Sequence, residues 1–263
     1  MKRRHLFEWE DQPWFPHAWR NYMTDLLQFT FTKFAWRAPK TKELLGELLD
    51  RMGTDTIVDL CSGSSGPLVW LRAKLEEERG RPVQVILTDK FPNLAAFRAL
   101  AANSGGRFRF REDSIDATAV PADLAGIRTL FLAFHHFRPE QARAILRSAV
   151  EQGRAIAVFE AAERDWKALL LMPLIPLIVW VVTPAVRPVT LGRVFWTYLI
   201  PVVPLAVWWD GVVSCLRSYT VKELREMAEN VEGKRYIWKA GKERVMGTPG
   251  VFTYLIGFPS KSA

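Results

Sequence analysis

Few cysteines and several missing motifs exclude many classes of site in this chain of 263 residues. Cys61 and Cys215 cannot form a disulfide framework, and no C-x-x-C or His/Cys cluster has the spacing of a structural zinc site. A P-loop is excluded because G-x-x-x-x-G-K-[ST] does not occur. The basic N-terminus is followed by acidic residues where a signal peptide needs an apolar segment. We therefore expect a protein of the reducing cytoplasm.

The balance of charged and apolar residues excludes a disordered chain. Hydrophobic residues make up 49% of the sequence and charged residues 24%, which predicts one large domain, or one domain with a substantial insertion. The formal net charge of +8 favours acidic partners or anionic membrane surfaces. Basic residues recur between 234 and 244, but no recognisable nucleic-acid module accompanies them. We interpret them as a solvated strand face and expect no nucleic-acid partner.

Short apolar segments alternate with helical patterns along the middle of the chain. The predicted strands and intervening helices are 56–60, 67–78, 83–88, 93–102, 108–111, 129–134, 139–152 and 155–159, after a first helix at 42–52. This alternation predicts an α/β fold with a parallel sheet and helices on both faces. A capping box of Thr220 and Glu223 opens a further helix, and two strands follow it near 236–239 and 251–257. We expect a seven-stranded, mostly parallel sheet with an antiparallel last strand.

Two segments do not follow this alternation. Residues 1–40 are rich in aromatic side chains, and we expect short helices there that cover another part of the molecule. Residues 168–186 and 194–209 contain no charged side chain. The prediction is thus an aromatic N-terminal cover at 1–40 and an α/β domain at 41–263, which carries an apolar helical insertion at 164–219.

A loop of small residues, Cys61 to Gly66, lies between the first predicted strand and its helix, where it lets a ligand approach the backbone. It lacks the G-x-G-x-x-G of a dinucleotide site. Asp59, Asp89 and Asp113 end the first three strands, and these ends line one crevice in an open α/β sheet. Each acid alone is more often a helix cap or turn residue. Together they are suited to accept hydrogen bonds from an ammonium group, a ribose diol or an adenine amine.

These segments together resemble the motifs of class I S-adenosylmethionine-dependent methyltransferases. VDLCSGSSG resembles the first motif of that family, LTDK its acidic second-strand end, REDSID its third-strand motif and FLAFHHF the segment after strand four. The resemblance covers residues 56–159 and the last two strands. It implies S-adenosylmethionine as cofactor and S-adenosylhomocysteine as product.

The resemblance also implies roles for the matching residues. Asp59 and the backbone of the loop would hold the methionine end of the cofactor, Asp89 the ribose hydroxyls, and Asp113 with Ser114 the adenine. Cys61 and Ser65 depart from the usual G-x-G-x-G. The residues expected to bind the cofactor are Asp59, Cys61, Ser62, Gly63, Gly66, Asp89, Lys90, Asp113, Ser114 and Phe134.

Three residues at the ends of the fourth and fifth predicted strands are candidates for catalysis. His135 and His136 follow the fourth strand, and a histidine there is suited to take a proton from an acceptor that must lose one. The alternative is that one histidine packs or caps the next helix while the other lines the cofactor pocket. Glu160 ends the fifth strand and either faces the same crevice or pairs with Arg164.

Two missing motifs narrow the range of methyl-transfer reactions. No N-P-P-[FY] follows the fourth strand, which argues against the usual methylation of adenine amino groups or glutamine amides. No aspartate pattern of the metal-dependent catechol type occurs there either, so we predict no metal.

The apolar insertion has three interpretations: a buried subdomain over the pocket, a dimer interface, or an interfacial membrane anchor. Pro173, Pro176 and Pro184 interrupt its first run, and an interior proline costs a helix about 3 kcal/mol, which argues against a clean transmembrane pair. In each interpretation, aromatic side chains offer the acceptor an apolar wall. The residues expected to bind the acceptor are Trp14, Trp19, Tyr22, Trp196, Tyr198, Trp209 and Asp210.

The sequence thus predicts a cytoplasmic methyltransferase that acts on a small hydrophobic, aromatic or lipid-like acceptor. A membrane surface and a second copy of the chain stay open as further partners. The main alternative is a non-catalytic, membrane-peripheral binding protein with a methyltransferase-like fold. A short-chain dehydrogenase fits less well, because the chain has no Tyr-x-x-x-Lys and its first loop does not suit a dinucleotide.

Overall fold

The computed structural model describes residues 1–34, 39–231, 236–247 and 250–260. Trp36 of the aromatic N-terminal segment, and Lys234 and Arg235 of the basic segment, lie outside the described residues. The helices and strands follow in the order α1 (His17–Phe34), α2 (Pro39–Met52), β1 (Thr56–Leu60), α3 (Leu68–Arg79), β2 (Gln84–Leu87), α4 (Leu94–Asn103), β3 (Phe108–Phe110), β4 (Ile127–Phe131), η2 (Phe134–His136), α5 (Pro139–Glu151), β5 (Ile156–Glu160), α6 (Trp166–Leu171), η3 (Met172–Leu174), α7 (Ile175–Val182), η4 (Thr183–Ala185), α8 (Leu191–Val194), η5 (Phe195–Leu199), α9 (Val202–Arg217), α10 (Val221–Glu229), β6 (Tyr236–Arg244) and β7 (Val251–Pro259).

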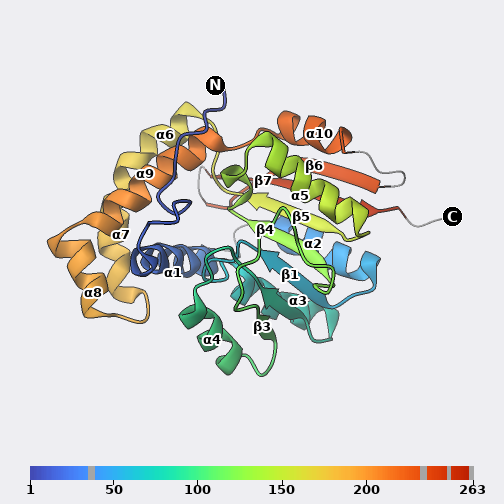
Figure 1. Cartoon of the computed structure of the whole chain (residues 1–263), viewed down its shortest axis with the longest axis horizontal. Helices are drawn as coiled ribbons and strands as arrows, with labels where there is room; N and C mark the ends of the chain where they lie inside the picture. The colour runs from blue at the N-terminus through green and yellow to red at the C-terminus, as the bar shows by residue number, and fades with distance from the viewer. Residues whose placement is uncertain (35–38, 232–235, 248–249, 261–263) are drawn as a thin grey trace.

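The predicted seven-stranded sheet is confirmed. Its strand order is β3-β2-β1-β4-β5-β7-β6, and the neighbouring pairs among β1 to β5 are parallel (Figure 1). Strand β7 runs antiparallel to both β5 and β6. The order reverses direction at β1, which pairs with β2 on one side and β4 on the other. A crevice therefore opens at the carboxyl end of β1, where ligands bind in folds of this kind.

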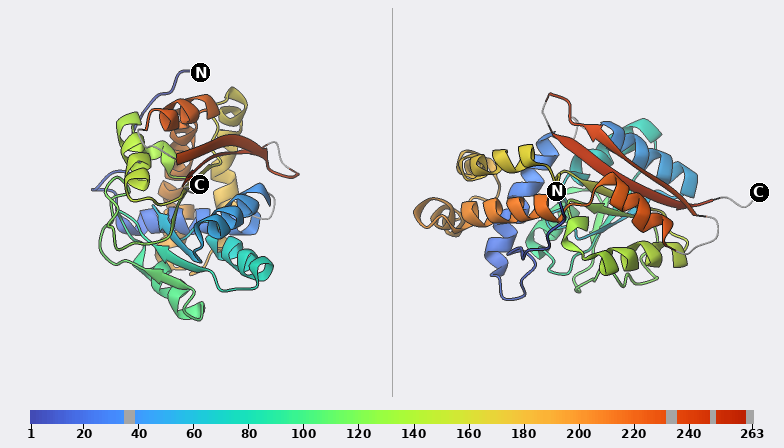
Figure 2. Two further views of the ribbon diagram at one scale, coloured as in Figure 1. Left: turned by 90° about the vertical axis from the view of Figure 1, so that its right-hand side faces the viewer. Right: turned by 90° about the horizontal axis from the view of Figure 1, so that it is seen from above.

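The sheet is covered on both faces, as its uninterrupted apolar strands require. Ile57 of β1 packs into one core with α2, α3 and Phe97 of α4. The next residue, Val58, points to the opposite face and packs into a second core with α5 and α10. Figure 2 shows α2 and α3 on one side of the sheet and α5 and α10 on the other. The alternation of side chains along β1 thus divides the domain into two apolar layers.

Two sequence predictions need correction. Strand β4 spans Ile127–Phe131 rather than 129–134, because Leu132 has a φ of 55° and ends the extended conformation. A short 3₁₀ turn then carries the two histidines. The aromatic N-terminal segment forms one helix of 18 residues, α1, after an irregular stretch, and not a series of short helices.

The apolar insertion lies between β5 and α10 and packs against α1. Its prolines divide the first run as expected but do not end it: Pro173, Pro176 and Pro184 each stand within the first two residues of a new helical segment. Proline is tolerated there because its missing N–H has no partner to lose. Residues 166–185 consequently form one continuous helical run. A third apolar core joins this run and α9 to Met23 and Leu26 of α1.

The capping box of α10 generates a stability prediction. The Thr220 hydroxyl accepts a hydrogen bond from the Glu223 N–H, and the Glu223 carboxylate accepts one from the Thr220 N–H. Replacing Thr220 with Ala should lower the free energy of unfolding by about 1 kcal/mol, measured by urea denaturation. Lys222→Ala, which removes an exposed side chain from the same turn, is the control and should stay within about 0.5 kcal/mol of wild type. Equal losses in both variants would contradict the capping role.

Candidate active site at the carboxyl end of the sheet

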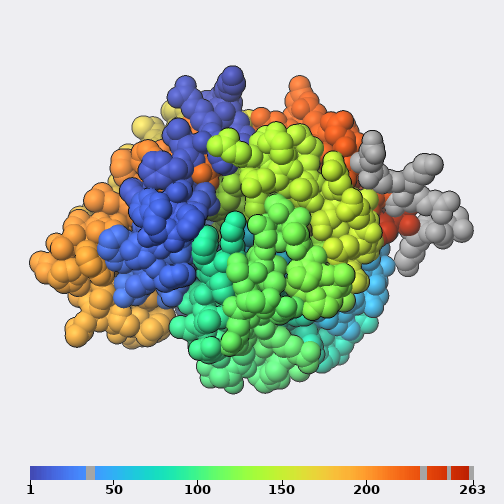
Figure 3. All heavy atoms as spheres, in the orientation of Figure 1, coloured from blue at the N-terminus to red at the C-terminus, as the bar shows by residue number. Residues whose placement is uncertain are grey.

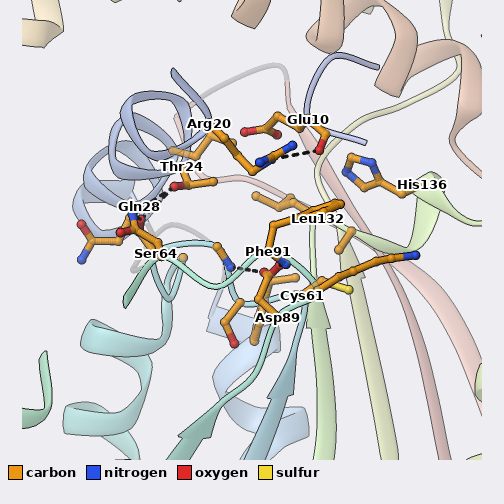
Figure 4. A pocket seen from close by; sticks show the side chains of 18 of the residues that line it. Glu10, Arg20, Thr24, Gln28, Cys61, Ser64, Asp89, Phe91, Leu132 and His136 are labelled. Carbon is orange, nitrogen blue, oxygen red and sulfur yellow. Dashed lines mark hydrogen bonds between the residues drawn. The ribbon is translucent and has the colours of Figure 1, made fainter. Parts of the chain in front are cut away.

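A cavity of about 310 Å³ lies where the carboxyl ends of β1, β2 and β4 meet. Its floor is the loop from Cys61 to Gly66, and α1 forms one wall through residues that include Thr24 and Gln28. In Figure 4 the labelled side chains of α1 lie on one side, and Cys61 and Asp89 lie on the other. The crevice predicted from the strand ends is therefore present, and the N-terminal helix bounds it on one side.

The loop after β1 has an unusual backbone. Gly63 and Gly66 have φ values of 53° and 49°, which glycine adopts without steric cost. Cys61 and Ser65 have φ values of 57° and 84°, although neither is glycine. Such residues cost of order 1–3 kcal/mol and cluster at functional sites. The loop thus keeps a glycine-type conformation at the two positions where the expected glycines are replaced.

Asp89 holds this loop in place. One carboxylate oxygen of Asp89 accepts a hydrogen bond from the Gly63 N–H at 2.8 Å, and the other accepts one from the Phe91 N–H at 2.8 Å. Burial raises the pKa of Asp89, and these two backbone donors oppose that rise. Each oxygen retains a second lone pair, so the carboxylate can still accept from a ligand hydroxyl.

Helix α1 is bound to the same loop by a buried polar network. The Ser64 hydroxyl donates to the Asp25 carboxylate at 2.8 Å and lies 2.9 Å from the Thr24 hydroxyl. Asn93, the N-cap of α4, donates to Ser64 at 2.8 Å and to Asp25 at 3.1 Å. Arg193 of the insertion forms an ion pair with Asp25. One carboxylate therefore joins α1 to the loop, to α4 and to the insertion.

A cation closes another part of the cavity. The guanidinium of Arg20 stacks on the ring of Phe91 at 4.2 Å from its centroid and donates to the backbone oxygens of Glu10 and Gln12. Its buried Nη1 atom has no hydrogen-bond partner. Arg20 can therefore offer a donor to an anionic group in the cavity.

His136 reaches the cavity with two carboxylates behind it. Its Nδ1 atom lies 2.8 Å from Glu8 Oε2 and 2.8 Å from Asp11 Oδ1. Burial opposes the imidazolium, but the two carboxylates outweigh it and raise the pKa of His136 well above its usual value. Arg217 contacts both acids, at 3.4 Å from Glu8 and 2.5 Å from Asp11. The network anchors the irregular N-terminal segment across η2 and α9.

His135 stacks on His136, with 4.3 Å between the ring centroids, but a different carboxylate binds it. Its Nδ1 atom lies 2.8 Å from Glu160 Oε2, and its backbone N–H donates to Glu160 Oε1 at 3.1 Å. The expected pairing of Glu160 with Arg164 is absent from the contacts of the described residues, because Arg164 pairs with Glu223. Ligand atoms of Glu8, His135 and His136 lie within 4.8 Å of one another, a spacing that a metal ion can use. Arg217 and His136 already place positive charge beside Glu8, so we assign no metal there.

The structure brings some of the residues predicted to bind the cofactor together and leaves others apart. Those that line the cavity are Cys61, Ser62, Gly63, Gly66, Asp89 and Lys90. Asp59 is buried behind the loop, where it accepts a hydrogen bond from Thr129 at 2.5 Å, and burial raises its pKa to about 7. Asp113 pairs with Arg111, and Ser114 donates to the Lys90 backbone. Phe134 is buried in the second core.

Of the candidate catalytic residues, His136 lines the cavity, whereas His135 and Glu160 are not among the residues that line it. The residues predicted to bind the acceptor also lie outside it. Asp210 accepts hydrogen bonds from the Trp9 and Glu10 N–H groups, and Trp19 packs against Trp196 at 4.9 Å between ring centroids. The others outside the cavity are Trp14, Tyr22, Tyr198 and Trp209.

Several cavity residues were missed from the sequence. Phe91 and Asn93 come directly after the LTDK segment, so their place next to that motif could have predicted them. Glu10, Asp11, Arg20 and Thr24 carry no motif, and only the fold of the N-terminal segment brings them to the sheet. Burial, with Asp210 nearby, raises the pKa of Glu10 to about 8.

Comparison with known proteins identifies the fold. The chain matches no protein-family model and no curated protein. It is similar to the CMeT domain of the citrinin polyketide synthase, with a TM-score of 0.50 and 14% identity over 86% of this chain and 53% of that one. It is also similar to the S-adenosylmethionine-dependent methyltransferase SibL in its apo form, with a TM-score of 0.48 and 16% identity over 85% of this chain and 55% of that one. A third similar structure is human N-acetylserotonin methyltransferase in complex with S-adenosylmethionine, with a TM-score of 0.47 and 12% identity over 84% of this chain and 52% of that one.

The first of these matches, with the strand order given above, shows the class I methyltransferase fold that the motifs implied. The chain spans about half the length of each of these three solved structures.

The close approach of α1 to the loop generates a second prediction. A Cβ atom at Gly63 would lie 3.2 Å from Thr24 Cγ2, whereas one at Gly80, which has a similar positive φ, would meet nothing within 4 Å. Both Gly→Ala variants carry a backbone cost of about 1–2 kcal/mol. We expect Gly63→Ala to lose more stability than Gly80→Ala in thermal denaturation, and Thr24→Ser to restore part of the difference. Identical losses would show that α1 does not press on the loop.

Proposed function

We propose that this chain is an S-adenosylmethionine-dependent methyltransferase whose acceptor is hydrophobic, aromatic or lipid-like. The observation that carries the proposal is the position of the cavity: it joins the small-residue loop after β1, the carboxylate after β2 and a histidine after β4 at one edge of a sheet with the class I order. The loop and the carboxylate suit the cofactor, and the histidine suits an acceptor that must lose a proton.

The residues present fit the cofactor. The small residues from Cys61 to Gly66 line the cavity and let a ligand approach the backbone, and the carboxylate of Asp89 keeps lone pairs for ribose hydroxyls. The carboxylates of Asp11 and Asp89 suit the ammonium and sulfonium charges, and the unpartnered Nη1 of Arg20 suits the cofactor's carboxylate. When bound, S-adenosylmethionine supplies an electrophilic methyl group.

The chain's own contribution is positioning and proton transfer. His136 is held by Glu8 and Asp11 through Nδ1, so its neutral form keeps the proton on that atom and leaves Nε2 as an acceptor. Nε2 would thus accept the proton of a hydroxyl on the acceptor, while the loop and Asp89 would hold the cofactor that supplies the methyl group and leaves as S-adenosylhomocysteine. Helix α1 forms one wall of the cavity beside the reacting atoms.

The apolar lining indicates the class of acceptor. Leu27, Phe31, Phe131 and Leu132 line the main cavity. A second cavity of about 160 Å³, lined mostly by apolar side chains, shares Phe31 and Phe131 with the first. An acceptor that extends from His136 toward this second cavity would therefore bury an apolar body, which favours a hydrophobic molecule over a sugar or nucleotide.

Cofactor binding gives the first test of the proposal. Titration calorimetry should detect binding of S-adenosylmethionine and S-adenosylhomocysteine to the wild-type protein. Asp89→Asn should weaken both affinities by about tenfold or more, which corresponds to about 1.4 kcal/mol, because it removes the charge that strengthens hydrogen bonds from ribose hydroxyls.

Asp113→Asn is the matched control, because Asp113 is exposed, pairs with Arg111 and does not line the cavity. Its affinities should stay at the wild-type values. If the folded wild-type protein binds neither compound, the methyltransferase proposal is wrong and a non-catalytic role is favoured.

The role of His136 gives a second test, with tritiated S-adenosylmethionine and a panel of phenolic and lipid-like acceptors. His136→Asn should lower turnover by about a hundredfold or more and leave cofactor affinity unchanged. The base acts only when neutral, so turnover should rise with pH through the raised pKa of His136. Glu8→Gln removes a charge that raises this pKa, and the profile should move to lower pH.

His17→Asn, which replaces an exposed histidine at the start of α1, is the control and should retain wild-type turnover at every pH. Unchanged turnover in His136→Asn would show that His136 is not a base and that catalysis rests on positioning alone.

A further inference from the structure

The insertion exposes more apolar surface than a water-soluble monomer usually does. Of the 22 large hydrophobic residues that are exposed in the described chain, 16 lie between 166 and 205. Leu191 is 90% exposed, Val181 79% and Leu199 72%. In Figure 3 this segment forms a lobe at one end of the molecule. Contiguous apolar surface of this kind marks a contact with a membrane or with another protein.

Several polar groups of the insertion bond to the protein itself. Trp180 donates its indole N–H to the Thr197 backbone at 2.9 Å, and the Tyr198 hydroxyl donates to the Trp180 backbone at 2.6 Å. Arg193 is buried, where it pairs with Asp25 and donates to the Val186 backbone at 3.1 Å. The outer face is consequently left to apolar groups, which a hydrocarbon environment requires.

The first helical run of the insertion has the composition of a membrane segment. Residues 166–185 have a mean hydropathy of 2.2 over their best window, and only 11% of that window is buried inside the protein. A core helix of a soluble protein passes the same test of composition but is mostly buried. Residues 191–199 and 202–217 form a second apolar pair, bent by 71°.

Packing against α1 determines how this surface meets its partner. Val179 of α7 and Val203 of α9 pack on Met23 and Leu26 of α1, whose other face lines the cavity. Figures 1 and 2 show the insertion lying beside α1. A complete crossing of a bilayer would carry α1 and the cavity with it. The arrangement instead suits a helical pair that lies in the interface with its outer face embedded.

The charges of the insertion indicate which kind of partner its apolar surface binds. From 166 to 209 the sequence contains Lys167, Arg187 and Arg193 and no Asp or Glu. Lys167 and Arg187 are exposed beside the apolar residues, and the whole chain carries a net charge of +8. Cations at the edge of an apolar face are attracted to anionic lipid headgroups. A second copy of this face would bring the same cations and no carboxylate from residues 166–209 to neutralise them.

We propose that residues 166–205 bind the interface of a bilayer that contains anionic phospholipids, and that this contact keeps α1 and the cavity at the membrane surface. The proposal is independent of methyl transfer, since the contact is made by side chains that do not line the main cavity. It places the source of a lipid-like acceptor next to the helix that forms one wall of the site.

Vesicle flotation of the intact protein without cofactor tests this contact. The protein should float with vesicles of phosphatidylcholine and phosphatidylglycerol and bind more weakly to phosphatidylcholine alone. Val181→Glu and Leu199→Glu should each lower the partition coefficient by about tenfold or more, because burial of one such side chain is worth about 1.5–3 kcal/mol. Ile237→Glu, at an exposed apolar residue of β6, is the control and should float like wild type.

The role of the cations beside the apolar face is tested separately with Arg187→Glu. This variant should lose the preference for phosphatidylglycerol and keep the weaker binding to phosphatidylcholine. The proposal is overturned if the wild-type protein stays unbound with both vesicles, and light scattering that then shows a stable dimer would assign the face to a second copy. Equal loss of binding in Ile237→Glu would overturn it as well. Cofactor titration of the same samples shows independently whether the cavity is functional.

Discussion

The partly buried carboxylate of Asp25 is the contact on which the rest of the site depends. It accepts from Ser64 of the loop after β1, from Asn93 at the start of α4 and from Arg193 of the insertion. Burial raises the pKa of Asp25, and these partners oppose that rise by stabilising its charged form. A single helix residue thereby fixes the cavity wall, the loop and the apolar lobe relative to one another.

Charge is distributed unevenly around the cavity. Acids from the N-terminal segment, Glu8 and Asp11, face His136 and Arg217, while Asp89 binds backbone donors on the opposite side. A cofactor with separate positive and negative groups matches such a mixed lining, whereas a pyrophosphate would meet too many carboxylates. The same N-terminal segment lines the cavity through Glu10, Asp11 and Arg20, so one part of the chain supplies both a wall of the site and much of its charge.

Sequence patterns predicted the sheet well because its strands are short apolar runs with turn residues between them. They also located Asp89 and the loop from Cys61 to Gly66. They did not distinguish His135 from His136, since the turn after Leu132, and not any periodicity, decides which ring faces the cavity. Asp113 was assigned with the other acids, but it stands at the outer strand of the sheet and pairs with Arg111 in solvent. The pairing of Asp11 with His136 joins positions too far apart in the chain for any local motif to record.

Helix α1 is thus the shared wall between a proposed cofactor site and a proposed membrane face. The most direct test of this arrangement is hydrogen exchange of the intact protein with and without saturating S-adenosylhomocysteine. Slower exchange is predicted in the loop from Cys61 to Gly66 and along α1, the two segments that Asp25 and Ser64 connect. Protection confined to other parts of the sheet, with α1 exchanging at its unliganded rate, would contradict the account.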